Sequence, residues 1–143
     1  MLEQATLEAL RDAFWPVYVV AITVAAVAAL TQVKWSLGRV TLALIAGSLA
    51  QTYWEGAGYL QWWQHMAIDV PVFIAITMPP RRYWQSAIGG LVFAQLVLHA
   101  TWAMAPELAR AHWLGCILLG FAKCAVLLLW SGGGRVERVL GGA

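Results

Sequence analysis

Long apolar stretches alternate with short polar gaps from Ala13 to Gly134, and basic residues lie mainly in every second gap. Two such gaps and the C-terminal tail hold six of the nine lysines and arginines, namely Lys34, Arg39, Arg81, Arg82, Arg135 and Arg138. Cytoplasmic loops of membrane proteins collect lysine and arginine. The pattern therefore predicts an integral membrane protein of a bacterial inner (cytoplasmic) membrane, with the N-terminus outside and the C-terminus inside.

The composition supports this placement and excludes other classes of protein. The chain is 62% hydrophobic and 11% charged, and a soluble fold of 143 residues could not bury so much apolar surface. Its net charge of +2 follows from the basic gaps, and no basic face interleaved with aromatic residues is present. We therefore expect the lipid bilayer as a partner, and we do not expect nucleic acid.

The apolar stretches predict an all-α bundle of about five transmembrane helices, each near the ~20 residues needed to cross the hydrocarbon core. The expected spans are Phe14–Leu30, Arg39–Tyr59, Trp62–Met78, Tyr83–Met104 and Ala111–Trp130. The third is short and contains Pro71, which we expect to interrupt it. If that stretch is re-entrant, the number of crossings falls to four.

The same pattern divides the chain into three parts. Residues 1–12 are expected to form an interfacial N-terminal segment, residues 13–131 the helical bundle, and residues 132–143 a flexible, glycine-rich cytoplasmic tail. Small residues recur at every fourth position at Ala21, Ala25 and Ala29, and such faces let helices pack closely in lipid. The helix packed against this face could belong to the same chain or to a second copy.

Tryptophan is abundant, with nine residues that map to the two predicted membrane boundaries. Indole rings prefer the headgroup level, so aromatic belts explain the pattern without a cofactor. The expected outer belt is Trp15, Trp54, Trp62, Trp63, Trp102 and Trp113, and the expected inner belt is Trp35, Trp84 and Trp130.

Polar side chains are costly inside a bilayer, and three of the expected helices each carry a polar pair spaced by four residues. The pairs are Gln51 with Glu55, His65 with Asp69, and Gln95 with His99. Counting outward from the turns at 1.5 Å per residue sorts them, together with Lys123, into two layers. The deeper layer contains Asp69, Lys123, Gln51 and Gln95, and the layer nearer the outer face contains Glu55, His65 and His99.

Three interpretations of the deeper layer are open. Asp69 and Lys123 could form a structural ion pair, Lys123 could extend toward the inner interface without a partner, or Asp69 could relay protons or ions. Pro71 frees a backbone carbonyl one turn earlier, which would add an acceptor near Asp69.

The histidines of the outer layer admit several interpretations. The simplest is that His65 and His99 are hydrogen-bonded interfacial side chains and that no cofactor is bound. Alternatively, they could ligate haem iron from facing helices, hold zinc together with Glu55, or pass protons toward Asp69. His112 is expected at the outer surface.

No nucleophile elbow, phosphate-binding glycine loop or HExxH motif is present, so we lean against an enzyme. A lipid-directed enzyme using His65 as base and Asp69 as its orienter stays a minor alternative. In size, helix-only layout and basic tail the chain is similar to the holins of bacteriophages, which usually have fewer spans. The leading prediction is a bundle that self-associates or joins a membrane complex, with ion or proton conduction or pore activity. The alternatives are a haem- or metal-binding electron-transfer or accessory subunit using His65 and His99, and a purely structural subunit.

Overall fold

The computed structural model describes residues 4–32, 34–56, 61–79 and 82–131. It is 94% helical, and no strand occurs among these residues, so the prediction of an all-α protein is confirmed. The predicted tail at 132–143 lies outside the described residues, as does the side chain of Glu55.

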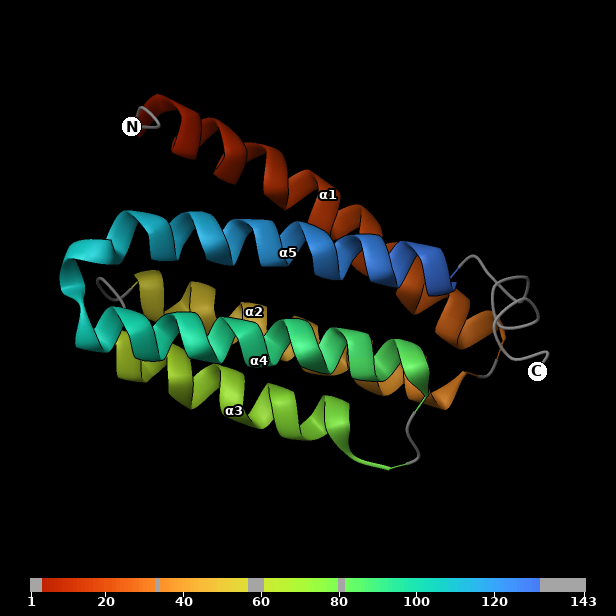
Figure 1. Cartoon of the computed structure of the whole chain (residues 1–143). Helices are drawn as coiled ribbons and strands as arrows, with labels where there is room; N and C mark the ends of the chain where they lie inside the picture. The colour runs from red at the N-terminus through yellow and green to blue at the C-terminus, as the bar shows by residue number, and fades with distance from the viewer. Residues whose placement is uncertain (1–3, 33, 57–60, 80–81, 132–143) are drawn as a thin grey trace.

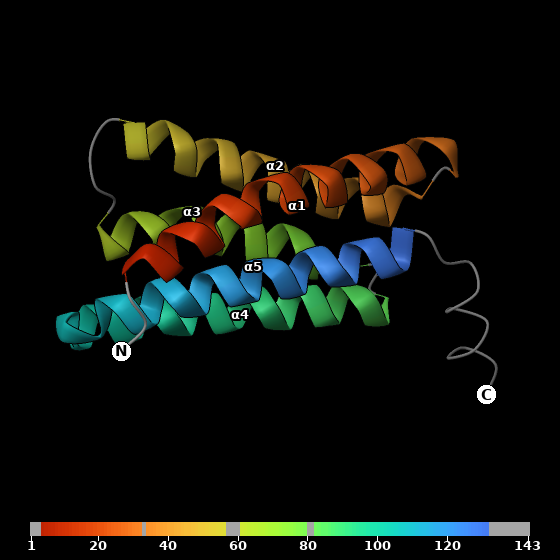
Figure 2. The same ribbon diagram turned by 90° about the horizontal axis from the view of Figure 1, so that it is seen from above.

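The described residues form five α-helices, which pack as an antiparallel bundle in which neighbours in sequence are neighbours in space (Figures 1 and 2). Short connections between long helices favour this arrangement. α1 also packs along α5, which closes the five helices into a ring, and a short 3-10 helix, η1 (Pro106–Leu108), links α4 to α5. The α-helices are α1 (Gln4–Thr31), α2 (Trp35–Gly56), α3 (Trp62–Thr77), α4 (Tyr83–Met104) and α5 (Ala109–Ser131).

α1 is one continuous helix of 28 residues that runs obliquely across the bundle (Figures 1 and 2). Residues 4–12 of the expected interfacial segment therefore continue into the first apolar stretch without a break, and Pro16 lies within the same helix. Its small-residue face points into the bundle, where Ala21 and Ala25 are fully buried and Ala28 is nearly so. This face packs against helices of the same chain.

α3 continues through Pro71, so the expected interruption there is wrong. Proline removes one helical hydrogen bond, and neighbouring helices in a bundle can hold such a site in place. The helix begins with a capping box in which the Gln61 amide donates to Gln64 Oε1 at 2.6 Å. At its other end, Arg39 of α2 donates to the carbonyls of Met78 and Pro79 at 2.5 and 3.1 Å. α3 is thus a single helix, shorter than its neighbours, that does not turn back (Figure 1).

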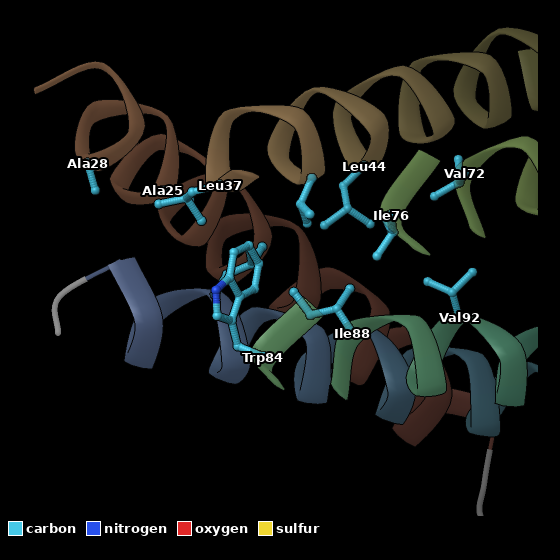
Figure 3. Close-up of a cluster of buried hydrophobic side chains, with 11 residues drawn as sticks. Ala25, Ala28, Leu37, Leu44, Val72, Ile76, Trp84, Ile88 and Val92 are labelled. Atoms are coloured by element: carbon cyan, nitrogen blue, oxygen red, sulfur yellow. The ribbon is translucent and has the colours of Figure 1, made fainter. Parts of the chain in front are cut away.

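A hydrophobic core fills the end of the bundle where α2 and α4 begin (Figure 3). Leu37, Ile76 and Ile88 are almost completely enclosed there. Trp84 is only 4% exposed and packs in this core, so its predicted place in a lipid-facing belt is wrong. This large aromatic side chain thus contributes to the packing of the core.

Within the part of the chain that the structure describes, three helical stretches are long and apolar enough to cross a membrane: Ala5–Thr31, Tyr83–Met104 and Pro106–Ser131. Large apolar side chains cover the outside of the bundle, for example Val20, Leu49 and Leu129. A surface of this kind suits a lipid environment. α3 has 16 residues, or about 24 Å at the helical rise, which is shorter than a typical hydrocarbon core of about 30 Å.

Candidate functional site

The buried carboxylate of Asp69 is the centre of a polar cluster between α3, α4 and α5. Asp69 Oδ2 accepts a hydrogen bond from Gln95 Nε2 at 2.7 Å and one from His99 Nε2 at 2.9 Å. Asp69 and Gln95 are each 7% exposed and His99 is 1% exposed, so water does not compete for these bonds. Polar groups enclosed in this way must be paired within the protein, and these are.

Lys123 reaches this cluster from α5 through an amide. Its ammonium donates to Gln95 Oε1 at 2.6 Å, while the other end of the same amide donates to Asp69. Gln95 therefore bridges the two formal charges instead of a direct ion pair, and Lys123 does not extend away without a partner. Of the predicted deeper layer, three members are thus joined: Asp69, Gln95 and Lys123.

A second arm of the cluster runs from His99 to residues that sequence reasoning placed elsewhere. His99 Nδ1 lies 2.8 Å from His112 Nε2, and Cys116 Sγ lies 3.5 Å from the same nitrogen. His112 is 3% exposed, so its expected position at the outer surface is wrong. The ring of Trp102 covers it, with ring centroids 4.7 Å apart.

A signal for His112 and Cys116 was present in the sequence. They are four residues apart, and Lys123 lies a further seven along, so all three fall on one face of a helix. Counting residues from the turn placed His112 at the outer surface. Such a count gives the position along the helix axis, but it does not show whether a neighbouring helix covers the side chain.

The tautomer of His99 follows from its partners. An ionised carboxylate can only accept hydrogen bonds, so His99 Nε2 carries the proton that binds Asp69. The other nitrogen, Nδ1, then presents a lone pair to His112 and Cys116. In this arrangement His112 donates to His99 through Nε2, while His112 Nδ1 is buried with no hydrogen-bond partner among the described residues.

His65 lies beside this cluster but is oriented differently. Its ring stacks on that of His99 with centroids 4.8 Å apart and an interplanar angle of 14°, and its Nδ1 pairs with Gln51 Nε2 at 3.0 Å. Stacked imidazoles present their faces to each other, whereas a bis-histidine haem needs two ring nitrogens aimed at one iron. The arrangement thus does not suit haem held between His65 and His99.

Three ligand atoms do converge on one point: His99 Nδ1, His112 Nε2 and Cys116 Sγ all lie within 4.8 Å of one another. Metal–nitrogen bonds of about 2.0–2.1 Å and a metal–sulfur bond of about 2.3 Å, at tetrahedral angles, would separate nitrogen from sulfur by about 3.6 Å and the two nitrogens by about 3.3 Å. The His112–Cys116 distance already fits, and the two imidazoles would need to separate by about 0.5 Å. His99 Nδ1 and Cys116 Sγ, which lie within 4.8 Å of each other, would need to approach to about 3.6 Å.

The residues around these ligand atoms fit a metal as well. A metal-ligating histidine usually donates its second nitrogen to a carboxylate, which fixes the ring and its tautomer. Asp69 makes that contact with His99. The predicted metal set of His65, His99 and Glu55 differs from this one, because His65 directs Nδ1 to Gln51 and the side chain of Glu55 lies outside the described residues.

The fold and the cluster together define a class, an all-helical bundle with candidate membrane-spanning helices and a buried, histidine-rich polar centre. No protein-family profile, curated protein or solved structure matches the chain.

Proposed function

We propose that this chain is a small polytopic inner-membrane protein that binds one transition-metal ion through His99, His112 and Cys116. The observation that carries the proposal is the convergence of these three ligand atoms within 4.8 Å, with the second nitrogen of His99 held by a buried carboxylate. This develops the metal-binding alternative of the sequence analysis, with two new ligands in place of His65 and Glu55. The protein would act as a metal-carrying electron-transfer or accessory subunit of the membrane.

The donor set narrows the choice of metal. Two imidazoles and a thiolate suit zinc and copper, and three protein ligands leave a coordination position open. Formal charge favours monovalent copper. The formal charges of Asp69 and Lys123, which Gln95 bridges, sum to zero. The negative charge of a Cys116 thiolate balances that of a monovalent ion, so the metal-loaded cluster stays neutral. A divalent ion would leave one net positive charge in an apolar bundle, which is costly.

Supporting the membrane placement are the three apolar helices and the positions of the basic residues. We propose five crossings, with the N-terminus outside and the basic gaps inside. α2 would also span the membrane, although it carries polar residues. Its Ser48 hydroxyl and Leu44 carbonyl are hydrogen-bonded to Tyr18 of α1, which lowers the cost of placing them in the bilayer. The bilayer would become locally thinner around the short α3. Ion or proton conduction, pore formation and self-association stay predictions.

Metal analysis of the purified protein tests the proposal. The protein is purified in detergent under reducing conditions from cells supplied with copper and zinc, and its metal content per chain is measured. We expect close to one copper per chain in the wild type. Cys116→Ala and His112→Ala should each lose most of it. Cys124→Ala is the matched control, because Cys124 is the other cysteine of α5 but belongs to no ligand cluster among the described residues.

Each other outcome has a distinct meaning. Wild-type protein that stays metal-free after reconstitution with copper and zinc would contradict the site. Equal metal content in the wild type and Cys116→Ala would contradict the ligand assignment. One zinc in place of copper would keep the site and refute the charge argument. A Soret band would replace the proposal by the haem alternative.

A further inference from the structure

A groove between α3 and α4 lies at the opposite end of the bundle from the metal cluster, where α3 ends and α4 begins (Figure 1). Its volume is about 280 Å³, and the residues that matter for its chemistry are Phe73, Thr77, Gln85, Gly90 and Phe93. Phe93 is 56% exposed, so the groove opens on the outside of the bundle. In a membrane that side faces lipid.

Glycine creates the hollow. A Cβ built at Gly90 would meet no atom within 4 Å, so the space in front of this residue is empty. Phe73 and Phe93 border the same space with ring centroids 6.0 Å apart. An apolar lining around an open space suits an elongated hydrocarbon. The volume is slightly below the roughly 300–1,000 Å³ of ordinary small-molecule pockets, which fits part of an acyl chain better than a compact ligand.

One polar group in the groove has no partner among the described residues. Gln85 is 1% exposed, and its Oε1 accepts a hydrogen bond from the backbone amide of Arg82 at 2.9 Å. Its Nε2 is buried and bonds no atom among the described residues. Buried donors of native proteins are nearly always satisfied, so an unpaired one that lines a hollow points to an acceptor supplied by a ligand.

The charge at this end of the bundle specifies the ligand further. Arg82 is the N-cap residue of α4 and lies one helical turn before Gln85. It adds a formal positive charge to the positive end of the α4 dipole. A ligand with an acyl chain, a carbonyl oxygen and a negatively charged head would match the apolar lining, the Gln85 amide and this charge in turn.

We propose that the α3–α4 groove is a binding site for an anionic glycerophospholipid. One acyl chain lies in the open space in front of Gly90 and against the rings of Phe73 and Phe93, the ester carbonyl accepts the hydrogen bond of Gln85 Nε2, and the phosphate lies near Arg82. This proposal rests on the membrane placement of the proposed function but not on its metal site, since none of the groove residues is a proposed metal ligand.

Native mass spectrometry of the detergent-solubilised chain tests the site. The protein is titrated with phosphatidylglycerol and, separately, with phosphatidylcholine of the same acyl chains. We expect one phosphatidylglycerol to be retained at least fivefold more than phosphatidylcholine. Gln85→Leu should reduce that retention about fivefold or more, and Gly90→Leu should abolish it by filling the groove. Gln32→Leu, on an exposed glutamine in the turn after α1, is the matched control and should bind like the wild type.

Circular dichroism and gel filtration establish that each variant is folded, and Gln85→Leu decides the question if Gly90→Leu does not fold. Unchanged lipid retention in folded Gln85→Leu and Gly90→Leu would overturn the proposal. Equal retention of phosphatidylglycerol and phosphatidylcholine would contradict selection of an anionic headgroup by Arg82. A second copy of the chain, found as a dimer that Gly90→Leu dissociates, would replace the lipid as occupant.

Discussion

Asp69 and Lys123 lie on different helices, and their coupling can be measured through paired substitutions. Asp69→Asn keeps the shape of the side chain and removes its charge, while Lys123→Met removes the ammonium and keeps much of the apolar stem. Each single change leaves the other formal charge without its counter-charge. An uncompensated charge in a bundle interior costs about 3 kcal/mol or more. We expect each single variant to be destabilised by about that amount.

The magnitude of the coupling follows from the bridge. The bonds of 2.6 Å from Lys123 to Gln95 and 2.7 Å from Gln95 to Asp69, with the amide between them, fix how far apart the charges can be. The separation is no more than about 8 Å, which at an effective dielectric constant of about 20 gives at least about 2 kcal/mol of attraction. In the double variant this attraction is lost only once, so the double variant should be less destabilised than the sum of the singles by about 2 kcal/mol.

The assay is reversible unfolding in mixed micelles with increasing dodecyl sulfate, followed by circular dichroism. Four proteins complete the cycle: the wild type, Asp69→Asn, Lys123→Met and the double variant. The control cycle replaces Lys123→Met by Arg110→Met, which removes an exposed cation near the start of the same helix. A coupling energy below about 0.5 kcal/mol, equal to that of the control cycle, would refute the bridged pair.

Two further predictions concern packing and topology. Gly47→Ala should destabilise the bundle by about 1–3 kcal/mol, because the new Cβ would lie 2.8 Å from Val72 Cγ2. Gly90→Ala, which meets nothing within 4 Å, should be neutral or stabilising by up to about 1 kcal/mol in the same unfolding assay. In a cysteine-free background and right-side-out vesicles, a membrane-impermeant maleimide should label Gln61→Cys but not Gln32→Cys. The reverse pattern, or labelling of both, would contradict five crossings with the N-terminus outside.

The helices could be predicted because each is a long apolar run between breakers. The predicted span Tyr83–Met104 coincides with α4, and the expected ends of α5 differ from the observed ones by two residues or fewer. Pro71 misled the prediction for α3, since proline breaks isolated helices but removes only one bond from a helix supported by its neighbours. The sequence pattern thus located the helices, whereas packing against neighbouring helices determined that α3 continues through Pro71.

The candidate site was only partly predictable, because sequence counting gives height along a bundle and not lateral distance. Counting put Asp69, Gln95 and Lys123 at one level, and the structure joins them. An uncertainty of about 3 Å in height could not decide between a direct ion pair and one bridged by an amide. Counting also put His112 near the outer end of its helix, but its burial depends on Trp102, which covers it from the neighbouring helix.

Asp69 connects the two halves of the cluster, and this limits how the site can change. The same oxygen, Oδ2, binds Gln95, which leads to Lys123, and His99, which leads to the three ligand atoms. Charge compensation and the tautomer of His99 therefore depend on one atom. Replacing Lys123 would strengthen the negative potential at Asp69 and favour a divalent over a monovalent metal. Replacing Asp69 would remove the hydrogen bond that fixes the tautomer of His99, and the affinity for metal should fall about 10- to 100-fold. A substitution at Lys123 should thus change metal binding through Gln95 and Asp69, although Lys123 contacts no proposed ligand.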